Sequence, residues 1–142
     1  YKACLRFENS LLKAGTLQIV YNQLSKSVTN SAFHHGKGKG FNIQNSEDVT
    51  LEGNVFFDLV QVGGRVKNSK NVVIENNVIA HIDKRVVGKD FNNNDIILYP
   101  SGGLLVCTDR NDNCKENEVR GNVVAGTWNT GFGISGVKCD DS

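Results

Sequence analysis

The sequence predicts an all-β protein that folds as a right-handed parallel β-helix, a solenoid of about five turns. Three observations favour this fold. Asn followed by apolar residues recurs along the chain, the β-branched runs are short, and Gly, Asn, Asp and Ser separate these runs. The recurring motif is GNVFFDL at 53–59, NNVIAHI at 76–82 and GNVVAGT at 121–127. Such repetition is typical of solenoids, in which each repeat stacks on its neighbours to bury a continuous core.

The spacing of the motif predicts a column of stacked polar residues. Asn77 follows Asn54 by 23 residues, and Ser31 precedes Asn54 by the same interval. Asn122 follows Asn77 by 45 residues, which we interpret as close to two such steps. Because successive turns of a parallel β-helix lie about 4.8 Å apart, we expect these four residues to form a ladder of side-chain hydrogen bonds. Asn also tolerates the left-handed conformation that a sharp corner needs.

The segments around the ladder positions predict short strands. Residues 17–24 (LQIVYNQL) are interpreted as a strand near the start of the solenoid. The runs before the ladder positions have a β-branched start, and those after them combine glycine with apolar residues and a polar turn. None is long enough for a helix. A β-sandwich with Asn-rich turns is the alternative, although a sandwich does not require a fixed period. The runs lie at 38–48, 48–54, 62–71, 71–77, 101–112, 117–123 and 130–136.

The domain organisation follows from the extent of the repeats. The 142 residues are enough for one domain with its own core. We expect residues 1–26 to form the entry segment of the solenoid, residues 27–139 to carry the repeats, and residues 140–142 to be a tail. The chain begins with Tyr1 instead of Met, so we expect it to be a fragment of a larger multidomain protein.

One connection is longer than the others. Residues 83–101 read DKRVVGKDFNNNDIILYPS, with a strongly polar centre. Extra residues in a stacked solenoid leave as a loop on one face, and such loops often bind ligands. Lys84, Arg85, Lys89 and Asp90 could contact an acidic glycan, whereas an insertion without a role is the alternative.

The cysteines predict a disulfide. Cys107 and Cys114 flank the polar stretch TDRNDN, and a disulfide closing this loop would indicate an oxidising, extracellular setting. Four reduced cysteines are the alternative, and the absence of a CxxC pair argues against metal ligation. The pairing of Cys4 and Cys139 stays open. The stretch DRNDN lacks the Glu and Gly spacing of a calcium loop.

A second polar column is predicted by the same 23-residue interval. It joins His35, Asp58 and His81, which would share one face of the solenoid. A carboxylate between two imidazoles could raise their pKa values or hold a metal ion. A solvated corner explains the same pattern. We assign no catalytic residue and predict no cofactor or bound metal.

Charge and hydropathy exclude two classes of partner. The net charge is +1 without a long run of one sign, so we do not expect nucleic-acid binding. No stretch approaches the roughly 18 apolar residues of a membrane span, so this segment is not expected to insert directly into a membrane.

Three segments resemble a known family: residues 31–66, 71–82 (NVVIENNVIAHI) and 121–139 (GNVVAGTWNTGFGISGVKC). They are similar to the parallel β-helix segment of fibrocystin and fibrocystin-L, and the likeness covers residues 27–139. Those are large, membrane-anchored extracellular proteins. The broader superfamily includes hyaluronan-degrading cell-surface proteins, but their histidine-rich stretch of the PIHFH kind is replaced here by LQIVYNQL.

The resemblance implies a non-catalytic structural or adhesive module of an extracellular or cell-surface protein, including one on a cilium. Its expected partners are flanking domains of the same chain or neighbouring subunits, with a glycan or matrix component as a further option. Two alternatives stay open: a glycan-processing enzyme of the hyaluronidase or polysaccharide lyase kind, and a glycan-binding module.

Overall fold

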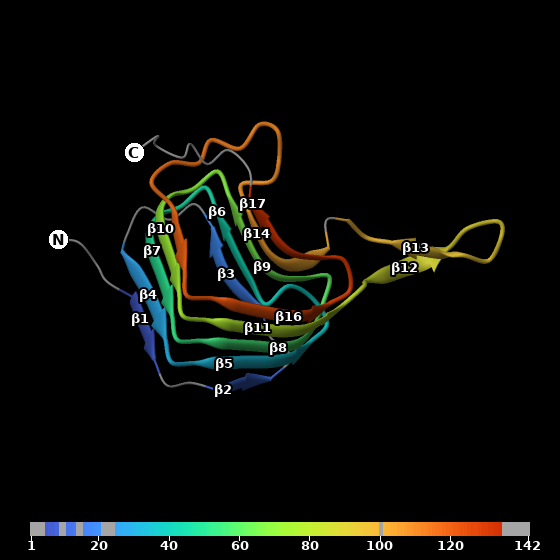
Figure 1. Cartoon of the computed structure of the whole chain (residues 1–142), viewed down its shortest axis with the longest axis horizontal. Coiled ribbons are helices and arrows are strands. Elements are labelled where there is room, and N and C mark those ends of the chain that lie inside the picture. The colour runs from blue at the N-terminus through green and yellow to red at the C-terminus, as the bar shows by residue number, and fades with distance from the viewer. Residues whose placement is uncertain (1–4, 9–10, 14–15, 21–24, 100, 135–142) are drawn as a thin grey trace.

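A computed structural model shows a right-handed parallel β-helix, as predicted (Figure 1). It describes residues 5–8, 11–13, 16–20, 25–99 and 101–134. Three sheets of five strands each wrap around a common axis, so the prediction of about five turns is confirmed. Every strand pair within these three sheets is parallel, which rules out the β-sandwich. The described part contains no helix that is long and apolar enough to span a membrane.

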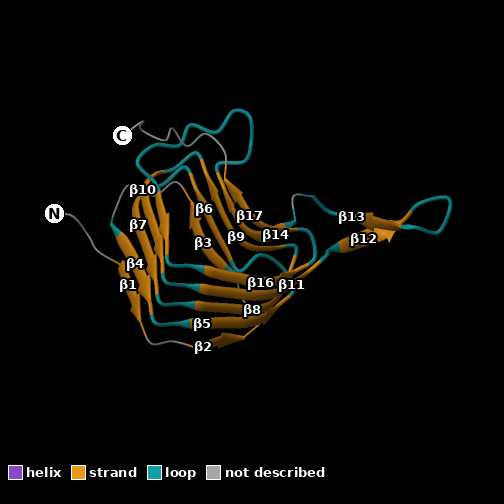
Figure 2. Ribbon diagram, in the orientation of Figure 1, coloured by secondary structure: helices purple, strands orange, loops and turns teal. Residues whose placement is uncertain are grey.

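Each turn contributes one strand to each sheet (Figure 2). Sheet A contains β1 (Leu5–Glu8), β4 (Lys26–Thr29), β7 (Glu47–Glu52), β10 (Lys70–Glu75) and β15 (Glu118–Arg120). Sheet B contains β2 (Leu11–Lys13), β5 (Ala32–Gly36), β8 (Val55–Val60), β11 (Val78–Asp83) and β16 (Val123–Thr127). Sheet C contains β3 (Leu17–Val20), β6 (Phe41–Gln44), β9 (Val62–Lys67), β14 (Gly102–Val106) and β17 (Thr130–Ile134). The predicted strand at 17–24 is therefore present over Leu17–Val20, and residues 21–24 lie outside the described part.

The core consists of apolar side chains that stack from turn to turn. Phe33 and Phe56 stack with ring centroids 4.9 Å apart and planes 10° apart, and Phe41 packs on Phe56 at 5.0 Å. Gly64 makes room for this cluster, because a Cβ atom there would lie 2.1 Å from the Phe41 ring. Close packing of this kind requires the register to be kept from turn to turn. The largest of the other fully buried side chains are Ile43, Val49, Leu51, Leu59, Val62, Ile74, Ile79, Ile82 and Leu104.

The fourth turn differs from the rest because it carries two insertions. The interpretation of the interval from Asn77 to Asn122 as close to two steps is wrong. The backbone N–H of Asn77 donates to Asn122 Oδ1 at 3.0 Å across 45 residues, so the two residues occupy adjacent turns. The additional length is taken up by one insertion between β11 and β14 and another between β14 and β15.

The first insertion leaves the solenoid within the predicted segment 83–101, and part of it forms a β-hairpin. Strands β12 (Val86–Lys89) and β13 (Asp95–Ile97) pair in antiparallel fashion and project from the solenoid (Figure 1). Asp90 closes the tip by accepting hydrogen bonds from the backbone N–H groups of Asn92 and Asn94, both at 2.8 Å. The VVGK and DII runs on either side of this turn form the hairpin because they satisfy each other's backbone groups.

Candidate functional site

The corner between sheets A and B holds the predicted ladder. The backbone N–H of Asn54 donates to Asn77 Oδ1 at 2.9 Å, and the Nδ2 group of Asn54 donates to the same oxygen at 3.0 Å. Asn77 Nδ2 in turn donates to Leu51 O at 2.9 Å. In the second turn, the backbone N–H of Ser31 donates to Asn54 Oδ1. Asn54 and Asn77 are fully buried, so their hydrogen bonds satisfy backbone groups that water does not reach.

The ladder asparagines are not the left-handed residues of this corner, which corrects one reason given for their recurrence. The residue that precedes each ladder position takes the positive φ: 47° for Asn30, 65° for Gly53, 54° for Asn76 and 63° for Gly121. This division of roles explains why the motif begins with either Gly or Asn. The first residue turns the chain, and the second supplies the buried amide or hydroxyl.

The outer face of sheet B carries the second polar column. Asp58 lies between two histidines, with His81 Nδ1 2.9 Å from Asp58 Oδ1 and His35 Nε2 3.4 Å from Asp58 Oδ2. The side chains of His35 and His81 are 54% and 65% exposed, so the column is open to solvent. The ring of Phe57 stacks on that of His81, and His34 Nδ1 contacts His35 Nδ1.

Backbone conformation is what turns this column outward. His35, Asp58 and His81 have φ values of 56°, 54° and 56°, in the left-handed region. The strand pairing skips these positions, because Phe57 pairs with Ala80 and the next pair joins Leu59 and Ile82. Two successive residues therefore face solvent on each strand. Left-handed non-Gly residues cost about 1–2 kcal/mol each, and here they recur at one position in three successive turns, as Asn45, Asn68 and Cys107 do after the strands of sheet C.

The chemistry available to the column is that of an oriented imidazole. When Asp58 is ionised, it accepts a hydrogen bond from His81 Nδ1, which fixes the ring and its tautomer. This is the arrangement of an acid–base pair. Among the described residues, no group of three or more His, Cys, Asp or Glu side chains is placed to hold a metal ion.

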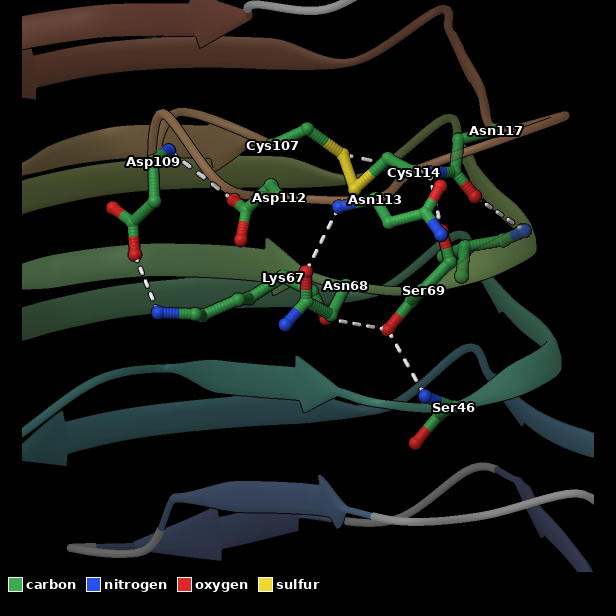
Figure 3. Close-up of a disulfide and its surroundings, with 11 residues drawn as sticks. Ser46, Lys67, Asn68, Ser69, Cys107, Asp109, Asp112, Asn113, Cys114 and Asn117 are labelled. Atoms are coloured by element: carbon green, nitrogen blue, oxygen red, sulfur yellow. Dashed lines mark hydrogen bonds and ion pairs between the residues drawn. A yellow bond between two sulfur atoms is a disulfide. The ribbon is translucent and has the colours of Figure 1, made fainter.

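The predicted disulfide between Cys107 and Cys114 is present (Figure 3). Cys107 follows β14 with a φ of 55°, and it takes the place that Asn45 and Asn68 hold after β6 and β9. The loop that it closes lies against the third turn, where the backbone N–H of Asn113 donates to Asn68 Oδ1 at 2.9 Å. The second insertion is therefore fastened covalently to its own strand and by hydrogen bonding to the turn beside it.

The same loop presents a carboxylate to the outer face of sheet C. Asp109 Oδ2 lies 2.6 Å from Lys67 Nζ and 2.8 Å from Arg65 Nη2 (the Lys67 contact is drawn in Figure 3). The hydrogen bond from Lys67 and the nearby positive charges hold the pKa of Asp109 below its ordinary value. The pKa of Lys39 is also lowered, first by partial burial and then by Arg65, Arg85 and Lys67. Arg65 and Lys67 therefore flank Asp109, and Lys39 lies within electrostatic reach of Arg65, Arg85 and Lys67.

Comparison with known proteins identifies the fold family. A family model described as a right-handed β-helix region matches residues 5–139. The chain belongs to this right-handed β-helix family. No curated protein and no solved structure matches it. Membership of the β-helix family is compatible with both structural and enzymatic modules, and it leaves the finer resemblance to fibrocystin as a proposal.

Within this β-helix, the two polar columns bring together the side chains singled out from the sequence. His35, Asp58 and His81 are in contact on sheet B, and the ladder residues are in contact at the corner. The basic group of Lys39, Arg65, Lys67 and Arg85 was not predicted as a whole. Only Arg85 was singled out from the sequence, because the other three residues are dispersed along the chain. One signal for it was the alternation in Arg65-Val66-Lys67, which puts both cations on the outer face of β9.

Proposed function

We propose that this chain is a non-catalytic structural and adhesive module of an extracellular or cell-surface protein. It contacts neighbouring domains of the same chain or neighbouring subunits through the outer face of sheet B. The observation that carries the proposal is an exposed apolar stripe on that face. Val55 and Val123 are both paired with Val78, so the three side chains form one column, and the exposed Phe57 lies beside it.

A contiguous apolar stripe on a flat sheet is typical of an interaction surface, whereas scattered exposed apolar residues are normal. The column of His35, Asp58 and His81 runs alongside and supplies the polar rim that such interfaces have. The disulfide supports an oxidising and therefore extracellular setting. The resemblance to fibrocystin-type proteins supports a location at the cell surface or on a cilium.

Association of the protein tests this proposal. Val78→Glu puts a charge in the middle of the stripe, and Val73→Glu is the matched control on the outer side of sheet A in the same turn. We expect Val78→Glu to weaken association roughly tenfold, as desolvating a charge opposes burial, and Val73→Glu to leave it unchanged. Sedimentation velocity measures self-association, and cross-linking on the producing cell measures association with neighbouring proteins. Equal association of both variants would contradict the proposal.

A glycan-processing enzyme is the second candidate, and the contact of Asp58 with two imidazoles on an exposed face favours it. The test is incubation with hyaluronan and with pectin, followed by measurement of new reducing ends and unsaturated uronate. Cleavage that disappears in Asp58→Asn would establish the enzyme and displace the first proposal. Intact polymer after prolonged incubation is the result expected for the non-catalytic module.

A further inference from the structure

The outer face of sheet C lies between the two insertions of the fourth turn. The hairpin leaves the solenoid just before β14, and the disulfide-closed loop leaves just after it (Figure 1). Arg65 and Lys67 project from β9 beneath this region, and Asp109 reaches down to them from the loop. This face is separate from the apolar stripe on sheet B, so a function of this face does not depend on the proposed function.

Positive charge exceeds negative charge on this face. Arg65 and Lys67 share a single oxygen of Asp109, so two cations have one carboxylate between them. Lys39 and Arg85 form no ion pair with a carboxylate of the described residues. Backbone hydrogen bonds from Val60 to Gly38 and from Gly40 to Val62 place Lys39 at the corner where sheet B leads into sheet C, and Arg85 lies two turns further on at the base of the hairpin. Partial burial of Lys39, followed by repulsion from the neighbouring cations, lowers the pKa of Lys39. A bound anion would relieve this repulsion.

Asp109 shows which chemistry the face accepts. Its carboxylate makes short contacts with a guanidinium and an ammonium group, as the carboxylate or sulfate of a bound ligand would. The disulfide and the contact between Asn113 and Asn68 hold the loop that carries it. Asp109 would therefore compete within the protein for Arg65 and Lys67 with any anion that binds this face.

An exposed aromatic pair lies close to Arg85, at the base of the hairpin. The rings of Tyr99 and Trp128 have centroids 6.5 Å apart, and both side chains are exposed. They lie near the base of the hairpin, where the backbone N–H of Leu98, the neighbour of Tyr99, donates to Arg85 O at 2.8 Å. Indole and phenol rings stack on the apolar face of a sugar ring, and a ligand here would meet aromatic rings and cations together.

We propose that the outer face of sheet C, between the hairpin and the disulfide-closed loop, binds an acidic polysaccharide. Lys39 and Arg85 contact its carboxylate or sulfate groups, while Tyr99 and Trp128 stack on its sugar rings. A polysaccharide fits better than nucleic acid because the chain as a whole has a net charge of only +1, which gives no broad basic surface. It fits better than an acidic peptide because the aromatic pair has a defined role only for sugar rings.

Binding of defined polymers by the intact, oxidised protein tests this assignment. Immobilised heparin, hyaluronan and polygalacturonate distinguish sulfate from carboxylate recognition, and dextran is the uncharged control. Lys39→Gln/Arg85→Gln removes two positive charges beside sheet C, one from the connection between β5 and β6 and one from the base of the hairpin. Lys70→Gln/Arg120→Gln removes two from sheet A and serves as the matched control. We expect the first pair to weaken binding roughly tenfold and the second to change it less than about twofold.

A change of opposite sign makes the test sharper. Asp109→Asn removes the internal competitor, so we expect it to tighten binding roughly threefold. Tyr99→Ala should weaken binding of the acidic polysaccharides and leave any weak binding of poly-glutamate unchanged. Circular dichroism checks that each variant is folded, and Arg85→Gln alone replaces the double variant if Lys39→Gln disturbs folding.

Three results would overturn the proposal. The first is an absence of binding to all three acidic polysaccharides at low ionic strength. The second is equal weakening by the substitutions on sheets A and C. The third is competition by poly-glutamate or single-stranded DNA as strong as that by the polysaccharides, since this would show a polyanion preference without sugar recognition.

Discussion

Two columns of polar side chains accompany sheet B, and they have opposite environments. Asn54 and Asn77 are fully buried at the corner that leads into the sheet. Asp58 and His81 each lie four residues further along the chain on its outer face, where Asp58 is partly exposed and His81 is exposed. Both columns arise from the same 23-residue interval, and in both a side chain bonds to its equivalent one turn away.

The comparison teaches that burial, and not repetition, decides what a stacked polar column contributes. A buried amide must find partners, because leaving a donor or acceptor unpaired costs about 1–3 kcal/mol. An exposed ion pair replaces contacts with water and contributes little to stability. The inner column is therefore expected to hold the turns in register, whereas the outer column can change without loss of the fold.

Removing an inner member should have the largest effect. Asn77→Ala deletes the acceptor of two hydrogen bonds from Asn54 and the donor to Leu51 O. We expect a loss of about 3 kcal/mol in the free energy of unfolding, measured by denaturant titration. Asn77→Ser is the graded control, since a hydroxyl can still accept from the backbone, and we expect it to cost about half as much. If Asn77→Ala and the parent chain had the same free energy of unfolding, the ladder would not stabilise the fold.

The corner between sheets C and A allows a test of covalent closure, because Cys107 stands where earlier turns have Asn45 and Asn68. Cys107→Ser/Cys114→Ser opens a loop whose ends are 7 residues apart. We expect a loss of about 2 kcal/mol, in keeping with closure of a short loop. The shift in the midpoint of thermal unfolding measures it. If nothing changes, the hydrogen bond from Asn113 and the ion pairs of Asp109 hold the loop without the disulfide.

The outer column should be far less sensitive. Asp58→Asn keeps a residue that tolerates the left-handed conformation and removes only the charge between the two imidazoles. We expect the free energy of unfolding to change by less than about 0.5 kcal/mol. Denaturant titration under the conditions used for Asn77→Ala gives a direct comparison. A loss as large as that of Asn77→Ala would contradict the distinction between the columns.

The hairpin lies outside the stacked turns, and ion pairs hold its base. Asp95 accepts from Lys84 and Lys89 at 2.6 and 2.7 Å, and these contacts lower its pKa from 3.8 to about 2. Its contribution is therefore fully present above 3.8 and is lost as the pH falls towards 2. We expect amide exchange in Val86–Lys89 to accelerate over this range, relative to β8 and after correction for intrinsic rates. Asp95→Asn should abolish that acceleration while leaving the unfolding midpoint unchanged.

Periodicity predicted the fold because the stack imposes its repeat on the sequence. The fixed interval between Ser31, Asn54 and Asn77 follows from hydrogen bonds that each turn makes to the next, so regular turns were readable from residue types alone. The fourth turn was misjudged since an insertion at a corner changes the spacing without disturbing the pairing. Nothing in the interval to Asn122 distinguishes one long turn from two short ones.

The candidate sites were predictable to the extent that they lie on one column. His35, Asp58 and His81 share a register position, so their spacing in the sequence is sufficient to predict that they meet. The basic face of sheet C joins Lys39, Arg65, Lys67 and Arg85 from different columns and from the base of the hairpin. Its assembly depends on where two insertions leave the solenoid, and that information is absent from the local sequence pattern.

The direction of the interstrand hydrogen bonds has a mechanical consequence. They run along the solenoid axis, while the strands run around it, and the first and last turns lie at opposite ends. A force applied between those ends would therefore break the hydrogen bonds between one pair of turns before those of the next pair, instead of breaking all of them at once. Under tension the solenoid would therefore lengthen in steps. Release of the third turn would free 23 residues, whereas release of the fourth would free 45. The disulfide would keep the segment between Cys107 and Cys114 closed, so this part would add no length.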